Sequence, residues 1–420
     1  MECRLQDLQK LGIEADIIQF HPYDHWGFAK MDQAHDEAYI RYVAARFSAF
    51  RNVWWTMANE YNIFDSRIPN VGPDVIKNWD RLFQTLQAAD PYGHLRGMHN
   101  AGPWYDDTKP WITHVVAQED WRLPHMVAKG RAYGKPVVID EYGYEGNTGE
   151  VWGDLTGREV MDRHWQISMA GGYASHGETY VHPGGLLWWA IGGELAGESP
   201  ARLKFLKEIM TVAPFQELTP DPTAVMGGQA LALAGQYYLF YFSKPNADPV
   251  QIRVDGSAPF NVDLIDPWQM KIYRLGRTSV GSQAMHLPLI PCLLRLTPAR
   301  GTAAGGLSAN LTELLARFIG DTTNPSTPSL RPFVQPREYY SLDFTLDELL
   351  DNSRARAAVE KFQPDLIKMR AKSPLIGGLA GRALVNSFDN ESPGTAYAQV
   401  KDLEAALAQI PSLPTDEKAK

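Results

Sequence analysis

Two glutamates near the ends of apolar runs are the residues of this chain best suited to chemistry. Glu60 comes two residues after the run 53–58, and Glu141 comes two residues after the run 136–139. Continuous apolar runs are typical of buried parallel strands, and the reacting groups of β/α barrels lie where such strands end. Retaining glycoside hydrolysis needs two such carboxylates, one as acid and base and the other as nucleophile.

The residues around Glu60 favour the role of acid. A glutamate that closes a buried strand is partly removed from water, which raises its pKa and favours the protonated form that a general acid needs. Asn59 beside it is suited to hydrogen-bond the sugar hydroxyl next to the reacting carbon. The alternative is that Glu60 caps the next segment through a backbone amide, but the strand with Trp54 and Trp55 in front favours catalysis.

Glu141 has the surroundings expected of the nucleophile. A nucleophile must stay ionised while its partner carries a proton, so it needs hydrogen-bond donors, and a tyrosine hydroxyl such as that of Tyr144 is one. Its acidic neighbours are the alternatives. Glu145 is a second candidate for the nucleophile, Asp140 is expected to be mainly a structural acceptor, and the non-catalytic alternative for Glu141 is a surface acidic turn. We therefore predict that Glu60 is the acid and base and that Glu141 is the nucleophile.

Polar and aromatic residues at the other strand ends are candidates for substrate binding. A lone histidine is more often structural than functional, but these histidines follow strands that face the expected pocket. One of two adjacent tryptophans in the last strand is expected to stack on a sugar and the other to pack against helices. The candidates, besides Asn59 and Tyr144, are His21, Tyr23, His99, Asn100, Glu178, Trp188 and Trp189.

Strands that alternate with helices position these residues and predict an α/β fold with a parallel sheet. The predicted strands cover 15–20, 53–58, 95–98, 112–117, 136–139 and 185–191. The predicted helices cover 34–50, 73–89, 121–133 and 157–170. A (β/α)8 TIM barrel takes eight strands and about 250 residues, so the first two βα units are missing from this pattern. Either strands are overlooked or, as we favour, the barrel begins upstream of Met1.

The pattern changes after Pro214, where many short strands are separated by Gly and Pro turns, as in a β-sandwich. A Gly- and Ala-rich stretch follows, and then several short helices, the first predicted over 345–362. The predicted units are an N-terminally incomplete barrel at 1–213, a β-sandwich at 214–298, a linker with a short helix at 299–339, and an α-helical module at 340–420.

Composition and missing motifs exclude several classes of function. The net charge is −9 and no long Lys/Arg run occurs, so a nucleic-acid partner is not expected. No run reaches the ~18 apolar residues of a membrane span, and the first 20 residues do not read as a signal peptide. As written the chain is expected in the cytoplasm, unless an upstream signal precedes it. Cys3 and Cys292 form no disulfide or zinc pattern, and nothing indicates a metal or cofactor.

The paired glutamate motifs resemble those of cellulase-like, clan-A glycoside hydrolase barrels. In that clan an Asn-Glu acid/base follows the fourth strand and a Glu nucleophile follows the seventh, which correspond here to Asn59-Glu60 and Glu141. The resemblance makes 15–20 the third strand and 185–191 the eighth. It also implies a substrate-binding arginine near the second strand, which this sequence does not contain.

Other segments are similar to a poorly characterised bacterial group within the clan. The segments 17–28, 54–61 and 176–180 carry this similarity. Residues 264–270 resemble a motif of a C-terminal sandwich sometimes labelled as collagen-binding, a label that does not establish collagen binding. The region from 340 to about 407 resembles a helical module appended to various bacterial carbohydrate enzymes.

The sequence thus predicts a retaining glycosidase with an oligo- or polysaccharide substrate. The alternative is a non-catalytic carbohydrate-binding protein built on a truncated glycosidase barrel. A third possibility makes the sandwich and the helical module a docking unit for another protein. The sequence leaves open the sugar, the linkage, endo or exo action, and the oligomeric state.

Overall fold

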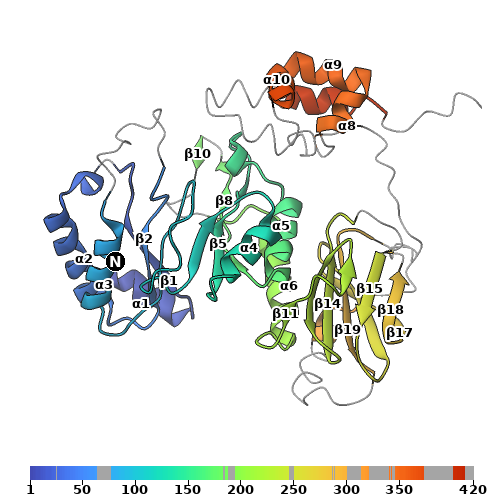
Figure 1. Ribbon diagram of the computed structural model, residues 1–420, viewed down its shortest axis with the longest axis horizontal. Helices are drawn as coiled ribbons and strands as arrows, with labels where there is room; N and C mark the ends of the chain where they lie inside the picture. The colour runs from blue at the N-terminus through green and yellow to red at the C-terminus, as the bar shows by residue number, and fades with distance from the viewer. Residues whose placement is uncertain are drawn as a thin grey trace, which may run out of the picture.

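The computed structural model contains an α/β unit, a β-sandwich and a small helical unit in chain order (Figure 1). The residues that it describes are 1–24, 26–63, 77–182, 185–187, 194–245, 250–285, 287, 289–299, 314–320, 340, 342, 346–372 and 401–411.

Six parallel strands in two runs of three build the α/β unit. The first run is β1 (Ala15–Phe20), β2 (Val53–Ala58) and β3 (Arg96–Gly97), and the second is β4 (Val115–Gln118), β5 (Val137–Glu141) and β7 (Tyr173–Ala174). The backbone N–H of Thr113 donates to the carbonyl of Arg96 at 3.0 Å and joins the two runs. Most residues of β2, β4 and β5 are apolar, and buried positions predominate in β2 and β4.

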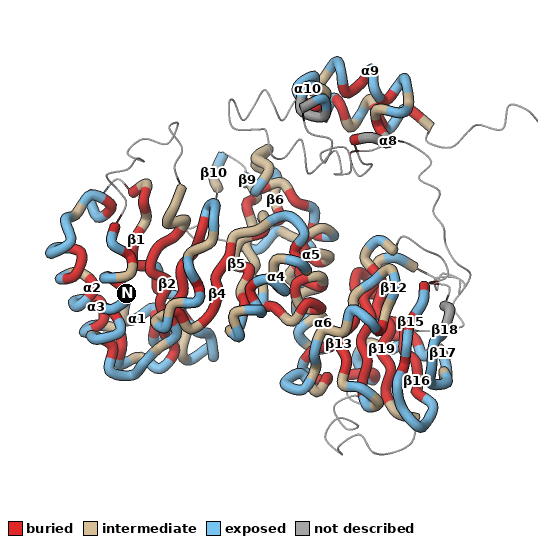
Figure 2. The backbone as a smooth tube through the Cα atoms, in the orientation of Figure 1, coloured by how far each residue is buried: buried red, intermediate tan, exposed pale blue. Residues whose placement is uncertain are grey.

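Helices cover the outer face of these strands. They are α1 (Glu2–Lys10), α2 (Gln33–Phe47), α3 (Trp79–Ala89), α4 (Leu123–Arg131), α5 (Gly157–Met169) and α6 (Ser199–Val212). An N-cap side chain accepts a first-turn N–H in three of them, α2, α3 and α5. Asp32 caps α2, and Thr156 with Glu159 forms a capping box on α5. The buried side chains form one core around Trp55 under α2 and α3, and another under α4 and α5. Figure 2 shows mainly buried residues along β2 and β4.

The predicted last strand, 185–191, is corrected by the structure. β10 (Leu186–Leu187) pairs antiparallel with β9 (Val181–His182), and residues 188–193 lie outside the described residues. The parallel neighbour of β5 is β7, which pairs Tyr173 with Val138. This strand escaped prediction because it is two residues long and follows Gly171-Gly172 without an apolar run.

The short strands predicted after Pro214 are present and form two sheets. One sheet has the order β11-β13-β14-β19-β16-β17 and the other β12-β15-β18. Their bounds are Thr219–Pro220, Val225–Met226, Gln229–Leu233, Tyr237–Phe242, Val250–Val254, Phe260–Asp266, Lys271–Thr278, Gly281–Met285 and Cys292–Pro298 for β11 to β19. The facing apolar side chains of the two sheets form a separate core.

The α/β unit and the sandwich share a packed interface. Trp268 of the sandwich lies between two guanidinium groups, that of Arg158 on α5 at 4.1 Å and that of Arg202 on α6 at 4.2 Å from its ring centroid. Residues 314–318 form a helical turn whose Leu314 is fully buried in the same interface. The short helix expected in the linker is therefore part of this core.

The helical unit has a core of its own, formed by α8 (Leu346–Asp351), α9 (Ser353–Phe362), α10 (Pro364–Lys372) and a helical segment at 401–407. The single helix predicted over 345–362 is broken at Asn352, whose side chain caps α9. Within the described parts of the chain, no helix is both long and apolar enough to cross a bilayer.

Candidate active site

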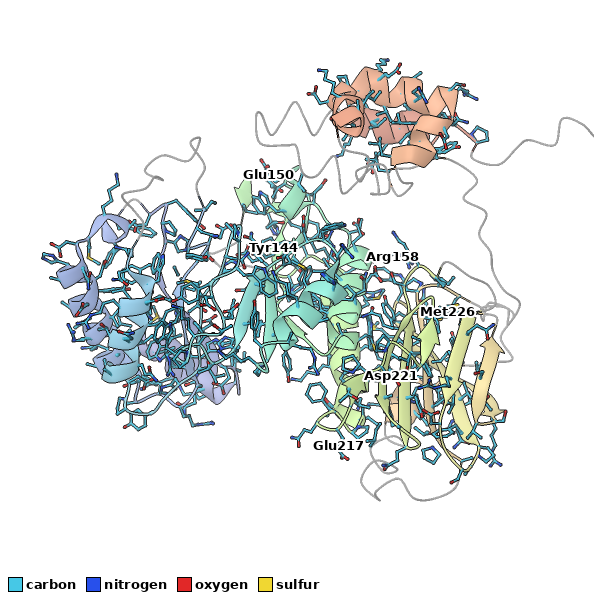
Figure 3. All side chains as sticks on the ribbon, in the orientation of Figure 1. Tyr144, Glu150, Arg158, Glu217, Asp221 and Met226 are labelled. Atoms are coloured by element: carbon cyan, nitrogen blue, oxygen red, sulfur yellow. The ribbon has the colours of Figure 1, made fainter. Side chains whose placement is uncertain are left out.

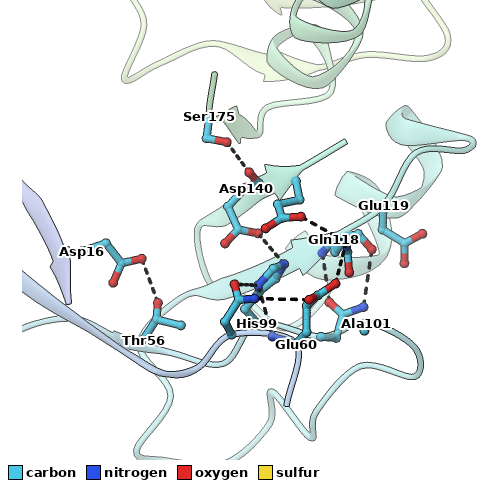
Figure 4. Close-up of polar contacts among 12 residues, drawn as sticks. Asp16, Thr56, Glu60, His99, Ala101, Gln118, Glu119, Asp140 and Ser175 are labelled. Atoms are coloured by element: carbon cyan, nitrogen blue, oxygen red, sulfur yellow. Dashed lines mark hydrogen bonds and ion pairs between the residues drawn. The ribbon is translucent and has the colours of Figure 1, made fainter. Parts of the chain in front are cut away.

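One side-chain amide joins the two predicted catalytic glutamates. Gln118, the last residue of β4, donates from Nε2 to Glu60 Oε1 at 3.1 Å and to Glu141 Oε2 at 3.1 Å (Figure 4). Two such contacts on one nitrogen keep these oxygens no more than twice 3.1 Å, or 6.2 Å, apart. The ends of β2, β4 and β5 therefore deliver their polar side chains to one place.

Glu60 is held in an uncommon backbone conformation. Its φ is +44°, in the left-handed region that non-glycine residues seldom adopt and that is often found at functional sites. The hydroxyl of Tyr23 donates to Glu60 Oε2 at 2.6 Å and accepts from Asn59 Nδ2 at 2.6 Å. The side chains of Tyr23 and Gln118 thus hold one oxygen each of the Glu60 carboxylate.

His99 lies beneath this group and is almost fully buried. Its Nδ1 is 2.8 Å from Asn59 Oδ1, and its Nε2 is 3.5 Å from Asp140 Oδ1. Burial lowers the pKa of His99 to about 4, so the ring is neutral. Burial also raises the pKa of Asp140, and the nearby negative charge of Glu141 adds to this. His99 therefore orients Asn59. The buried Asp140 Oδ1 has no hydrogen-bond partner among the described residues, so its role as a structural acceptor stays a prediction.

Glu141 differs from the expected ionised nucleophile. Burial, and next the negative charge of Glu60, raise its pKa from an ordinary value of 4.5 to about 7. Hydrogen bonds from Tyr144 and Gln118 oppose this rise. Glu141, predicted to be ionised, thus has a raised pKa, because it is buried and because a second carboxylate lies close to it.

Two more predicted residues lie around the pair. The hydroxyl of Tyr144 hydrogen-bonds Glu141, and its own pKa is raised by burial and by that carboxylate. The ring of His21 meets the ring of Tyr23 edge to face at 4.8 Å, and burial lowers the pKa of His21. Tyr144 thus contacts Glu141 directly, and His21 packs on Tyr23, which donates to Glu60.

Other predicted site residues have different roles or lie outside the described residues. Asn100 accepts the backbone N–H of Gln118 at 3.0 Å and donates to the carbonyl of Gly102, so it supports Gln118. Glu178 accepts the N–H groups of Ala196 and Gly197 and makes no described contact with the pair. Trp188 and Trp189 are not among the described residues.

Glu145, His176 and Glu178 have metal-ligand atoms within 4.8 Å of one another. However, Glu145 accepts the N–H groups of Glu198 at 2.6 Å and Ser199 at 2.9 Å, where α6 begins. The N-terminal end of a helix favours anions. These carboxylates therefore serve as helix and loop caps, and the site suits a cation poorly. Glu145, the second candidate for the nucleophile, is fully buried and its carboxylate accepts these N–H groups.

Gln118 was missed by the sequence analysis although a signal for it existed. It directly follows the apolar residues Val115–Ala117, as Asn59 follows 53–58. The predicted strand was ended at residue 117, and a glutamine carries no charge that would draw attention. Its hydrogen bonds to both glutamates depend on the fold.

A family model described as "Apiosidase-like, catalytic domain" matches residues 2–214. A second model, "Domain of unknown function (DUF5605)", matches residues 224–293 within the sandwich. The first match covers the whole α/β unit, including Glu60, Gln118 and Glu141. No curated protein matches the chain.

Solved structures of similar fold are glycoside hydrolases by their descriptions. A "putative glycoside hydrolase" from Bacteroides vulgatus is 32% identical with a TM-score of 0.61, and the match covers 71% of this chain and 62% of that one. A glycoside hydrolase family 5 protein from the same organism is 17% identical with a TM-score of 0.57, covering 71% and 74%. The second likeness concerns the fold alone.

Proposed function

The chain belongs to the apiosidase-like family of catalytic domains, and from this premise we propose that it is a retaining glycoside hydrolase. Glu141 attacks the anomeric carbon while Glu60 protonates the leaving oxygen, which gives a covalent glycosyl-enzyme. Glu60 then acts as a base on the water that releases the sugar. Tyr144 and Gln118 stabilise the ionised form of Glu141 by donating to it.

The observation that carries this proposal is the double hydrogen bond of Gln118. It limits the separation of the nearest Glu60 and Glu141 oxygens to 6.2 Å, twice 3.1 Å. Retaining enzymes hold their carboxyl groups about 5–5.5 Å apart, whereas inverting enzymes need about 6.5–9.5 Å to admit a water. The upper limit is compatible with the retaining arrangement.

We also assign the six parallel strands to places three to eight of a (β/α)8 barrel. β2, which ends before Asn59-Glu60, is then the fourth, β5 the seventh and β7 the eighth. This assignment follows the order of the parallel pairings and agrees with the roles proposed for both glutamates.

The family description makes an apiosyl bond the first substrate to examine, with β-glycosides and α-L-arabinofuranosides next.

Aryl glycosides test the function and separate the two roles. Glu141→Gln should lower turnover at least about 10³-fold with every leaving group, because the covalent step needs its carboxylate. Glu60→Gln should be less damaging with 2,4-dinitrophenyl glycosides, which need no protonation, than with poor leaving groups. Glu119→Gln is the matched control, since that carboxylate accepts from Trp104 Nε1 at 2.6 Å and lies beside Gln118.

Three outcomes would contradict the proposal. The intact chain could bind glycosides without cleaving any, which would favour the non-catalytic alternative. Both glutamine variants could keep their activity, or Glu119→Gln could be as harmful as Glu141→Gln.

A further inference from the structure

Exposed tryptophans are concentrated in connections at the end of the parallel strands where Glu60 and Glu141 lie. Of the ten tryptophans that the structure describes, three are exposed: Trp26 at 81%, Trp121 at 47% and Trp152 at 40%. Trp26 and Trp121 follow the carboxyl ends of β1 and β4, and Trp152 lies in a 3-10 turn (Val151–Gly153) of the connection from β5 to α5. Tryptophan is on average a highly buried residue, and these three exposed ones share the end of the strands where Glu60 and Glu141 lie.

Trp26 and Trp121 lie close in the chain to residues that build the site. The Asp24 carboxylate accepts the backbone N–H of Trp26 at 2.7 Å, and Asp24 directly follows Tyr23, the donor to Glu60. Two residues before Trp121, the N–H of Glu119 donates to the carbonyl of Glu141 at 2.8 Å. Tyr23 contacts Glu60 and lies three residues before Trp26. Glu119 contacts Glu141 and lies two residues before Trp121.

The side chain of Tyr144 links Trp152 to Glu141. Its ring meets that of Tyr144 edge to face at 6.2 Å, and its carbonyl accepts the Tyr144 N–H at 2.6 Å. Tyr144 hydrogen-bonds Glu141. Figure 3 shows Glu150, two residues before Trp152, above Tyr144 at the upper edge of the α/β unit.

We propose that Trp26, Trp121 and Trp152 are stacking platforms for sugar rings that flank the reacting one, so the substrate is an oligo- or polysaccharide chain. The inference rests on the proposed function and extends it to the class of substrate. An indole offers a flat apolar face to the C–H face of a sugar and an N–H at its edge to a hydroxyl. The guanidinium of Arg122 lies 5.1 Å from the Trp121 ring centroid and covers one of its faces, which leaves the other for a sugar.

Binding of sugar chains to the full-length Glu141→Gln protein tests the proposal without consuming the probe. The probes are cellohexaose, xylohexaose, arabinohexaose and hexagalacturonate, each compared by calorimetry with its monosaccharide. We expect at least one hexasaccharide to bind 10-fold or more tightly than its monosaccharide. Each tryptophan changed to alanine should weaken that binding about 3- to 10-fold, and Trp121→Phe should restore part of it.

Tyr92→Ala is the matched control. Tyr92 is 68% exposed but precedes β3, at the opposite end of the strands. The inference is overturned if no hexasaccharide binds more tightly than its monosaccharide, if the tryptophan variants bind as well as the parent, or if Tyr92→Ala weakens binding equally. Because this readout is binding, it is distinct from failure of the proposed function, which would appear as lack of aryl glycoside cleavage by the unmodified chain.

Discussion

At the scale of single residues, the site is governed by the burial of two carboxylates and by the repulsion between them. Glu60 and Glu141 share the donor Gln118, and the pKa of Glu141 is raised to about 7 by burial and by Glu60. Protons leave such a pair in steps that belong to both groups. A pair that holds one proton between its members is what the first chemical step requires, since one carboxyl must donate while the other attacks.

The raised pKa predicts a pH-dependent cost to stability. Between pH 4.5 and about 7 the folded chain holds a proton on Glu141 that the unfolded chain has lost. Stability from this group is therefore present at low pH and is lost as the pH rises through 7. Glu141→Gln should be more stable than the parent at pH 8, by up to about 3 kcal/mol, and closer to it at pH 5. Urea unfolding at both pH values measures this, and an equal difference at both would contradict the account.

The sequence was sufficient to place both glutamates but not to assign their protonation. Position follows from one rule, that polar residues after a buried apolar run lie at the carboxyl edge of the sheet. Protonation depends on which groups meet across strands, such as Tyr23 with Glu60 and Gln118 with both glutamates. These contacts join segments far apart in the chain, and the sequence pattern carries no record of them.

At the scale of elements, the loop that presents Tyr144 is fixed by the helix that begins at Ser199. The buried carboxylate of Glu145 accepts two N–H groups at the start of α6 and the hydroxyl of Tyr180 at 3.1 Å. This contact anchors α6 to the residue next to Tyr144, which hydrogen-bonds Glu141. Glu145, which caps α6, is therefore the chain neighbour of Tyr144, and Tyr144 hydrogen-bonds the proposed nucleophile Glu141.

Glu145→Ala should destabilise the α/β unit by about 2–3 kcal/mol, because it leaves buried N–H groups without an acceptor. The thermal unfolding midpoint measures this, and turnover should fall as Tyr144 loses its support. Glu194→Ala, at an exposed glutamate of the same connection, is the control and should change neither quantity. Equal behaviour of the two variants would show that Glu145 has no such role.

Elements with long apolar runs were predictable, whereas very short ones were not. The runs 53–58 and 237–242 are buried along nearly their whole length, and both were predicted as strands. β7 has only two residues and depends on its pairing with Val138 and Ile139. Tertiary hydrogen bonds define such a strand, so local sequence does not reveal it.

At the scale of the whole molecule, the α/β unit and the sandwich share one hydrophobic core. This core also includes residues that follow the sandwich in the chain. Leu314 and Leu315 are buried in it, and Phe318 meets Phe205 of α6 at 4.8 Å. Arg317 also pairs with Glu208 of α6 at 2.7 Å. The helical unit has a separate core.

Two truncations should therefore behave differently. Removing residues 321–420 should leave the thermal midpoint and the turnover of the α/β unit unchanged. Removing 300–420 also removes Leu314 and Leu315, which should cost several kcal/mol in lost apolar burial, about 2–5 for each. Differential scanning calorimetry distinguishes the two, and identical midpoints would contradict a shared core. An unchanged oligomeric state in both would weaken the docking-unit alternative.

The central claim, that Glu60 and Glu141 act on one sugar, is tested most directly by trapping the covalent intermediate. A 2-deoxy-2-fluoro version of the aryl glycoside that the protein cleaves fastest is incubated with it, and the peptides are mapped by mass spectrometry. The account predicts one glycosyl group on Glu141 and slower labelling in Glu60→Gln when the leaving group is poor. A label on any other residue, or a product of inverted configuration from an active but unlabelled protein, would contradict it.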